Sequence, residues 1–339
     1  MLTAPHAPVL AVTLNPALDL TYRVTALRPG QEHRPRAVGA RAGGKGVNVA
    51  RVLHTLGLPV LALAPVGGTH THDWQSDLAA AGVPAETVPI AGQTRRTVAV
   101  VEDDGRTTGL WEPGPRLTPD EWQRLTNRVR RLAAHSCVVV LSGSLPGGLP
   151  PSACADLVRH CHEAGAPVVL DTSGPALRAA LAAGPDLVKP NTAELAEYRG
   201  AKTGGHGPRD GHRTDPDEAA AHDAALLLDA GAAAVAASRG ADGLTAVAEG
   251  RAWHAAPPSV LRGNPTGAGD AAVAALAVTL ATGAAWPERL RHAVALSAAA
   301  VAAPLAGDVD PALYADLLTR TTVRDGGPFP PRTPGAARA

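Results

Sequence analysis

The sequence predicts an α/β protein with a doubly wound, mostly parallel sheet flanked by helices, and a small second sheet beside it. Apolar runs of strand length alternate with helical stretches from residue 138 to residue 199, which is the rhythm of βαβ units in a parallel sheet. Polar and apolar residues alternate over 94–101 and 105–111, the pattern of a hairpin with one exposed face. The 339 residues are enough to bury a sizeable core.

Up to residue 112, the expected elements are bounded by proline, glycine or polar turns. We expect the segment 20–37 to join the hairpin around Glu102-Asp-Asp-Gly105 in the small sheet. The remaining elements in this part are a strand over 9–14 ended by Asn15-Pro16, a helix that begins within 42–53, a strand over 59–66 and a helix over 73–81.

From residue 138 onward the chain alternates strands with helices. The expected strands cover 138–141, 168–170, 187–189, 232–237, 244–248 and 251–255. The expected helices cover 151–164, 175–182, 191–199, 217–230, 267–280, 286–302 and 310–320. Residues 200–216 have no apolar period and are expected to form a mobile surface loop. The tail 324–339, with its prolines and terminal arginines, is expected to be disordered.

Composition favours a small-molecule ligand. The 31 basic residues balance the 31 acidic ones, so no nucleic acid or anionic membrane is expected as a partner. Cys137, Cys154 and Cys161 show no C-x-x-C spacing and are interpreted as structural. The N-terminus lacks a basic n-region, and the alanine-rich tracts are too weakly apolar to span a membrane. We therefore expect a cytoplasmic protein.

The stretch Gly263-Asn-Pro-Thr-Gly-Ala-Gly-Asp270 is a loop that runs directly into an alanine-rich helix. Pro265 is excluded from a helix interior, so the helix is expected to begin near Gly267. A helix start offers unpaired N–H groups, and glycines without a Cβ let an anion come close to them. Asp270 beside such an anion suits a base that takes a proton from an attacking hydroxyl. The competing interpretation, a capping aspartate in the first turn, has equal weight on spacing alone.

A second glycine-rich helix start, Ala42-Gly-Gly-Lys-Gly-Val-Asn48, carries Lys45 and Asn48. It fails as a Walker loop because Gly46 replaces the hydroxyl residue, and as a dinucleotide fingerprint because Val49 replaces the third glycine. It suits a small anionic ligand with hydroxyl groups, although a glycine turn with a solvated lysine remains an alternative.

Three polar segments follow expected strands, where open α/β sheets bind ligands. Asp19 lies just past the first strand and is a candidate for holding a polar substrate, with an ordinary turn aspartate as the alternative. The other two segments are Ser142-Gly-Ser-Leu-Pro146 and Ser238-Arg-Gly-Ala-Asp-Gly243.

The two glycine-rich motifs, with Val188-Lys-Pro-Asn-Thr-Ala-Glu194 between them, resemble the signatures of the ribokinase/PfkB sugar kinases. The resemblance runs from about Val9 to about Leu318. Thr13-Leu-Asn-Pro-Ala-Leu-Asp19 and Leu187-Val-Lys-Pro-Asn191 are similar to the branch of 1-phosphofructokinases and tagatose-6-phosphate kinases. The resemblance implies a ribokinase-like domain over 1–323 with a β-sheet lid near 16–37 and 93–112. It also implies a homodimer joined through the lid.

The resemblance further implies roles by position. Asp270 matches the catalytic base, and the amides of Gly267, Ala268 and Gly269 match its anion hole. Asn191 and Glu194 match a motif that organises Mg²⁺ through water. The expected substrate and nucleotide contacts are Asp19, Gly43, Gly44, Asn48 and Ser144 for sugar hydroxyls, Lys45 and Arg95 for a sugar phosphate, and Lys189, Ser238, Gly240 and Gly243 for ATP.

The implied reaction is transfer of a phosphoryl group from ATP to a hydroxyl of a ketohexose phosphate, with fructose 1-phosphate as the preferred acceptor. In one respect the sequence departs from that branch: Thr97 stands where an asparagine is expected two residues after Arg95. This departure concerns the acceptor more than the chemistry. Kinases of tagatose 6-phosphate or fructose 6-phosphate remain alternatives, as does a sugar-phosphate sensor without catalytic activity.

Overall fold

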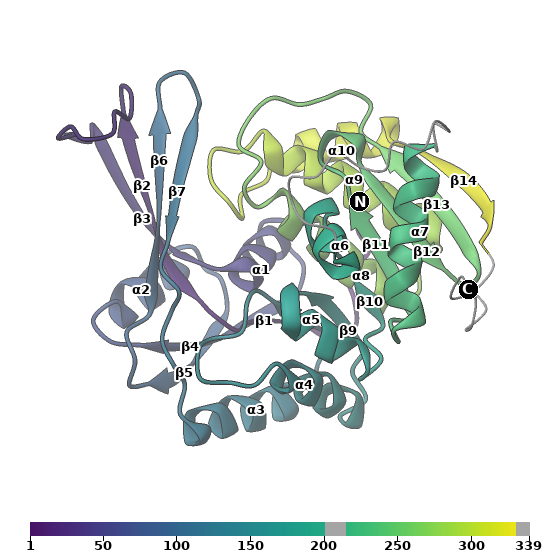
Figure 1. The fold of residues 1–339 in the computed structure, drawn as a ribbon, viewed down its shortest axis with the longest axis horizontal. Coiled ribbons are helices and arrows are strands. Elements are labelled where there is room, and N and C mark those ends of the chain that lie inside the picture. The colour runs from purple at the N-terminus through teal and green to yellow at the C-terminus, as the bar shows by residue number, and fades with distance from the viewer. Residues whose placement is uncertain (201–214, 330–339) are drawn as a thin grey trace.

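A ten-stranded sheet and a separate four-stranded sheet organise the protein. The structure is a computed structural model and describes residues 1–200 and 215–329. Helices cover both faces of the large sheet, and the small sheet projects to one side of it (Figure 1). The predicted α/β class with a second, smaller sheet is therefore confirmed. The loop expected over 200–216 lies almost entirely outside the described residues.

The large sheet has the strand order β14-β13-β12-β11-β10-β9-β8-β1-β4-β5. It is parallel from β5 to β11 and antiparallel from β11 to β14. Its strands are β1 (Val9–Thr13), β4 (Val60–Gly67), β5 (Ala85–Ile90), β8 (Val138–Ser142), β9 (Val168–Asp171), β10 (Leu187–Val188), β11 (Ala234–Ser238), β12 (Leu244–Ala248), β13 (Arg251–Ala256) and β14 (Thr322–Pro328).

Two hydrophobic cores lie on the two faces of this sheet, because successive side chains of a strand point to opposite faces. In β1, Val9 and Ala11 belong to one core, whereas Leu10 and Val12 belong to the other. The first core is covered by α1 (Lys45–Thr55), α2 (Thr71–Ala80), α8 (Ala268–Ala281), α9 (Trp286–Val301) and α10 (Pro311–Arg320). The second is covered by α3 (Pro119–Ala133), α4 (Ser152–Glu163), α5 (Gly174–Leu181), α6 (Thr192–Arg199) and α7 (Pro216–Asp229).

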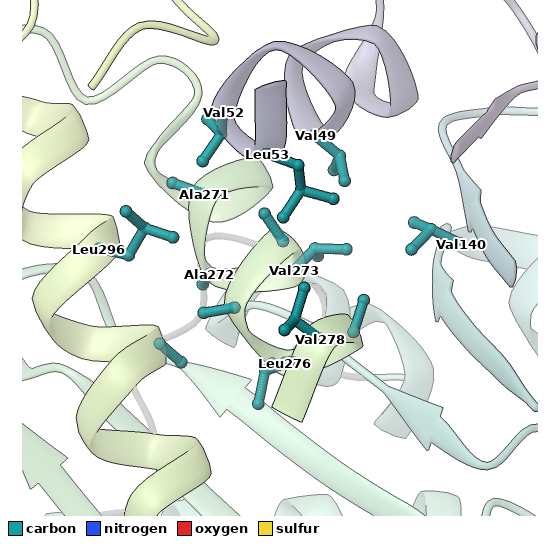
Figure 2. Close-up of a cluster of buried hydrophobic side chains, with 14 of the residues drawn as sticks. Val49, Val52, Leu53, Val140, Ala271, Ala272, Val273, Leu276, Val278 and Leu296 are labelled. Carbon is teal, nitrogen blue, oxygen red and sulfur yellow. The ribbon is translucent and has the colours of Figure 1, made fainter. Parts of the chain in front are cut away.

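Helix α8 is the most enclosed part of the first core. It packs between α1 and α9, and its residues 270–279 are all buried. Figure 2 shows Val273 and Leu276 of α8 among side chains from neighbouring elements, including Leu53 of α1. Alanine dominates the helix, and its small side chain allows helices to approach closely. The tight packing of α8 therefore fixes the position of its N-terminus relative to the sheet.

The small sheet has the order β3-β2-β6-β7, formed by β3 (Ala37–Gly43), β2 (Ala17–Val24), β6 (Arg95–Glu102) and β7 (Thr107–Trp111). It stands away from the body of the molecule in Figure 1. The predicted hairpin is present as β6 and β7, which pair antiparallel. Strand β3 extends the sheet past the expected limit at residue 37, because its pairing with β2 reaches Gly43.

The expectation of a disordered tail from residue 324 is wrong for residues 324–328. These residues belong to β14, which pairs with β13 at the edge of the large sheet and forms an ion pair between Asp325 and Arg251. The tail was expected to be disordered because of its prolines and terminal arginines, but an edge strand tolerates a proline such as Pro328. Residues 330–339 lie outside the described part of the chain.

Two elements occupy stretches that the sequence analysis leaves unassigned, β5 and α3. Helix α3 begins with a capping box in which Thr118 and Glu121 bond each other's backbone N–H. The Thr-Pro-Asp-Glu spacing is a start signal that was present in the sequence. No helix in the described part of the chain is both long and apolar enough to cross a lipid bilayer.

Candidate active site

A cavity of about 1020 Å³ lies at the carboxyl ends of the parallel strands, between the two sheets. The small sheet contributes Asp19, Arg95, Thr97 and Trp111 to its wall. Further lining residues come from the start of α1, the ends of β9, β10 and β11, and the start of α8. This position is where open α/β sheets bind ligands.

The N-terminus of α8 presents unpaired amides to this cavity. Gly267 is the N-cap with φ of 89°, and no side chain caps the helix. Among the described residues, neither the Gly267 amide nor the Gly269 amide has a hydrogen-bond acceptor, whereas the Ala268 amide donates to the Pro265 carbonyl at 3.2 Å. Two of the three amides predicted to form an anion hole are therefore available, and Ala268 is engaged within the chain.

Asp270 lies in the first turn of α8, buried but facing the cavity. Its carboxylate accepts a hydrogen bond of 2.7 Å from the Asn48 side chain on α1. Burial, followed by repulsion from Asp171, raises the pKa of Asp270 to about 7, although Asn48, Lys45 and Lys189 act in the opposite direction. A carboxyl group with a pKa near neutrality is suited to accept and release a proton.

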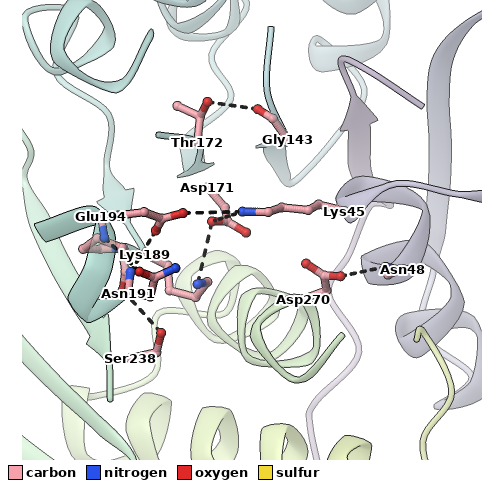
Figure 3. A network of polar contacts seen from close by, with 11 residues as sticks. Lys45, Asn48, Gly143, Asp171, Thr172, Lys189, Asn191, Glu194, Ser238 and Asp270 are labelled. Carbon is pink, nitrogen blue, oxygen red and sulfur yellow. Dashed lines mark hydrogen bonds and ion pairs between the residues drawn. The ribbon is translucent and has the colours of Figure 1, made fainter. Parts of the chain in front are cut away.

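Asp171 was not singled out from the sequence, although it occupies the centre of the polar network (Figure 3). It ends β9, and its fully buried carboxylate lies 3.1 Å from the Lys45 ammonium and 3.7 Å from the Lys189 ammonium. Burial alone would lower the pKa of Lys45, but Asp171, Glu194 and Asp270 outweigh it and raise that pKa. The rule that directed attention to polar residues after strands applies equally to Asp171.

Asn191 and Glu194 form a capping box at the start of α6. The Glu194 carboxylate accepts a hydrogen bond of 2.8 Å from the backbone N–H of Asn191, and the Asn191 side-chain oxygen accepts one of 2.9 Å from the backbone N–H of Glu194. The second Glu194 oxygen lies 3.9 Å from the Lys45 ammonium, which also contacts Asp171 (Figure 3). The motif thus has a local structural role, and one carboxylate oxygen still faces the ionic network.

These residues fit a hydrated magnesium ion. Asp171 and Glu194 both offer carboxylate oxygens near the Lys45 ammonium, and oxygen is the donor that Mg²⁺ prefers. Within residues 1–200 and 215–329, no group of three or more His, Cys, Asp or Glu side chains is arranged to hold a metal ion directly. An ion that keeps most of its waters needs few protein ligands.

The small sheet supplies Asp19 to the opposite wall of the cavity. Its carboxylate accepts a 2.5 Å hydrogen bond from the Thr97 hydroxyl. Gly43 lies against this carboxylate, because a Cβ at Gly43 would be only 1.9 Å from an Asp19 oxygen. Gly44 lines the cavity with φ of 113°, and Gly43 does not line it but makes room for Asp19.

Arg95 reaches the cavity, but much of its guanidinium group is engaged. It donates two hydrogen bonds to the Asn15 carbonyl and one to the Glu112 carbonyl. An arginine has five N–H donors, so two remain for a ligand. Ser144 does not line the cavity and instead accepts a 3.1 Å hydrogen bond from Asn15. Arg96, on the other face of the strand, is exposed and pairs with Glu112.

Among the residues predicted for the nucleotide, Lys189 lies beside Asp171 and Gly269, whereas Ser238, Gly240 and Gly243 lie at the end formed by β11 and the turn after it. Lys189, Ser238, Gly240 and Gly243 all line the cavity. Gly243 has φ of 83°, and a Cβ there would lie 2.0 Å from the Ala255 carbonyl oxygen, so a side chain is excluded. Apolar residues complete this end, among them Pro257, Val260, Leu261, Val294 and Ala298. A mostly apolar cleft with a few convergent polar groups is typical of a small-molecule site.

The fold and the site together define an α/β phosphotransferase. A carboxyl group with a pKa near 7, free helix amides and cationic side chains line one cavity. The sequence model described as pfkB family carbohydrate kinase matches residues 12–313. The chain belongs to this family and is a sugar kinase, which transfers a phosphoryl group to an alcohol.

Similar proteins extend over most of the chain. A 1-phosphofructokinase of Xanthomonas campestris pv. campestris is 38% identical over 276 residues, which is 80% of this chain and 83% of that protein. An ATP-dependent 6-phosphofructokinase isozyme 2 of Mycobacterium tuberculosis is 35% identical over 87% of this chain and 84% of its own length. The solved structure of phosphofructokinase-2 from Escherichia coli in complex with fructose-6-phosphate has a TM-score of 0.81 and 31% identity, covering 92% of this chain and 99% of that chain.

Proposed function

We propose that this kinase transfers the γ-phosphoryl group of ATP to a hydroxyl of a ketohexose phosphate, with fructose 1-phosphate as the preferred acceptor. The product is then fructose 1,6-bisphosphate. The observation that carries the proposal is the buried Asp270, whose pKa is raised to about 7, beside the free amides of Gly267 and Gly269. That pair supplies a base and an anion hole in adjacent residues of one helix start.

In the proposed step, Asp270 takes the proton of the acceptor hydroxyl while that oxygen forms a bond to the γ-phosphorus. The bond from the γ-phosphorus to the bridging oxygen breaks, and ADP leaves with the electron pair. The Gly267 and Gly269 amides donate to the transferring group, and the helix N-terminus stabilises its charge. Lys189, which lies near Gly269, adds positive charge on the same side.

Magnesium bound at Asp171 and Glu194, with Asn191 reached through water, would neutralise the negative charge of the nucleotide phosphates. The Lys45 ammonium lies within 4 Å of an oxygen of each of these two carboxylates. Its positive charge therefore partly neutralises the negative charge of Asp171 and Glu194. The two remaining donors of Arg95 and the partly exposed Lys45 supply the positive charge that a phosphorylated acceptor needs and a neutral sugar does not.

The acceptor is assigned by likeness and by charge. The Xanthomonas relative is named a 1-phosphofructokinase, and the Mycobacterium relative a 6-phosphofructokinase isozyme. Fructose 6-phosphate is thus a specific second candidate, and tagatose 6-phosphate a third. A sugar-phosphate sensor would bind the same ligands without turnover, and the intact set of Asp270, Asn48 and Lys189 argues for catalysis.

The test is a substrate panel with ATP and Mg²⁺, read by coupled detection of ADP. It compares fructose 1-phosphate, fructose 6-phosphate, tagatose 6-phosphate and fructose. We expect the highest kcat/KM for fructose 1-phosphate and the lowest for fructose. A higher value for either 6-phosphate overturns the acceptor assignment, and binding of a sugar phosphate without any ADP formation overturns catalysis.

We also propose that the small sheet joins two copies of this chain. Leu20, Val98 and Leu110 lie opposite one another on neighbouring strands. Each is next in sequence to a residue that lines the cavity, namely Asp19, Thr97 or Trp111. Because successive side chains of a strand point to opposite faces, these apolar residues form the outer face of the small sheet. Val38 and Leu110 there are more than 60% exposed. Light scattering should give a dimer mass for the wild type and a monomer for Leu110→Lys, with Arg106→Ala as a surface control. A monomeric wild type would contradict this assembly.

A further inference from the structure

Four residues form one continuous row across the small sheet. Arg41 on β3 lies opposite Asp19 on β2, Asp19 lies opposite Thr97 on β6, and Thr97 lies opposite Trp111 on β7. Directly opposed residues point to the same face of a sheet. Asp19, Thr97 and Trp111 all line the cavity, so this row faces the proposed acceptor.

Three arginines surround Asp19 but none of them fixes its carboxylate. The positive charges of Arg95 on β6, Arg41 on β3 and Arg51 on α1 each lower the pKa of Asp19. Arg41 is instead paired with Asp308, Arg51 with Asp77, and Arg95 with the backbone carbonyls of Asn15 and Glu112. Each cation is held by another acceptor.

Thr97 is the one side chain in the described part of the protein that donates a hydrogen bond to Asp19. Its hydroxyl lies 2.5 Å from the Asp19 Oδ1 atom. On the other side, the Asp19 Oδ2 atom packs against Gly43, where a Cβ would lie 1.9 Å away. The carboxylate is therefore confined between a hydroxyl donor and a glycine, and its orientation depends on both.

We propose that Thr97 is a positioning residue that orients the Asp19 carboxylate toward the acceptor hydroxyls, and thereby sets acceptor affinity rather than the rate of transfer. The inference rests on the proposed function, because it assumes that the acceptor sugar binds at this wall. Asp19 and Thr97 lie on the small sheet, whereas Asp270 lies on α8. A change at Thr97 therefore alters sugar binding without touching the base.

The test compares Thr97→Val, which keeps the shape and removes the hydroxyl, with Thr97→Ser, which keeps the hydroxyl. A hydrogen bond to a charged group is worth enough to change an equilibrium roughly 10- to 100-fold. We expect Thr97→Val to raise the acceptor KM by about that factor, with kcat and the KM for ATP nearly unchanged. Thr97→Ser should restore most of the acceptor affinity.

A pH profile separates positioning from packing. Burial raises the pKa of Asp19, and the Thr97 hydrogen bond opposes that rise. Loss of the hydroxyl should therefore move the acidic limb of acceptor affinity, measured by equilibrium binding so that the titration of Asp270 as a base does not dominate it, to higher pH in Thr97→Val but not in Thr97→Ser. An unchanged acceptor KM in Thr97→Val, or equal losses in both variants, overturns the inference.

A binding measurement keeps this inference separate from the proposed function. Trp111 is 75% exposed and lines the cavity, so its fluorescence should respond to a sugar phosphate without any turnover. Trp111→Phe identifies that signal among the five tryptophans. If wild type binds fructose 1-phosphate but does not phosphorylate it, catalysis fails. If Thr97→Val binds fructose 1-phosphate as tightly as wild type, the positioning role fails, whether or not the wild type phosphorylates the sugar.

Discussion

The Asn48 side chain donates a 2.7 Å hydrogen bond to the carboxylate of Asp270, although 222 positions separate the two residues in the sequence. Each of them lies in the first turn of a helix that begins with a glycine N-cap. The two helices, α1 and α8, pack against each other. The two glycine-rich motifs, far apart in the sequence, are thus joined at the proposed base.

Asp270→Asn should reduce kcat by about 10² to 10⁴, the usual contribution of a general base. The amide keeps the size of the side chain but does not accept the proton. Acceptor affinity, measured by equilibrium binding, should change little, since the acceptor hydroxyls are proposed to be held by the small sheet. Turnover close to that of the wild type would remove Asp270 from its proposed role.

Wild-type kcat should rise with pH and level off above about pH 7. The pKa of Asp270 is raised to about 7, so the carboxyl group is protonated and inactive as a base below that value. Asn48→Ala removes a hydrogen bond that lowers this pKa, and the acidic limb should move to higher pH. A limb that stays in place in the variant would show that another group controls the profile.

Stability should also respond to this carboxyl group. A folded-state pKa raised above the ordinary value of 3.8 stabilises the folded protein in acid, and this contribution is lost as pH rises through about 7. Asp270→Asn has no charge to bury. The variant should therefore have a higher Tm than wild type at pH 8, with a smaller difference at pH 5. The same Tm difference at both pH values would contradict the assigned pKa.

Gly267→Ala and Gly269→Ala form a matched pair that separates structure from anion binding. Gly267 has φ of 89°, and an added Cβ would lie 2.9 Å from the Ala306 Cα atom, so the variant should lose ~1–2 kcal/mol or more of stability. At Gly269 the nearest atom is 3.5 Å away, and alanine favours a helix. Gly269→Ala should keep its Tm yet lose activity, since its methyl group obstructs the anion site. Wild-type activity in Gly269→Ala would contradict that site.

Lys45→Met should weaken the binding of phosphorylated acceptors more than that of free fructose. It removes the cation that lies 3.1 Å from Asp171 and leaves that buried carboxylate with Lys189 as its remaining ion-pair partner. We expect an acceptor KM about tenfold higher for fructose 1-phosphate. The comparison of both acceptors, with the Tm as a check on folding, decides whether Lys45 recognises the phosphate or only supports Asp171.

Much of the fold could be predicted because its signals are local. Apolar runs such as 138–141 and the alternation over 94–101 define strands within a few residues, and Pro265 with Gly267 defines the start of α8. Helix α3 has an equally local signal, the capping box of Thr118 and Glu121. The prolines and terminal arginines of the tail predict disorder, whereas residues 322–328 form an edge strand that only its pairing with β13 reveals.

Within the site, the sequence alone determined the pieces that depend on neighbouring residues: a glycine-initiated helix and an aspartate in its first turn. The tertiary structure decided which distant residues meet. It placed Asp171 between two lysines and turned Arg95 toward backbone carbonyls. Such contacts arise from the order and register of strands, and the pKa of Asp270 depends on burial, a property that no short stretch of sequence contains.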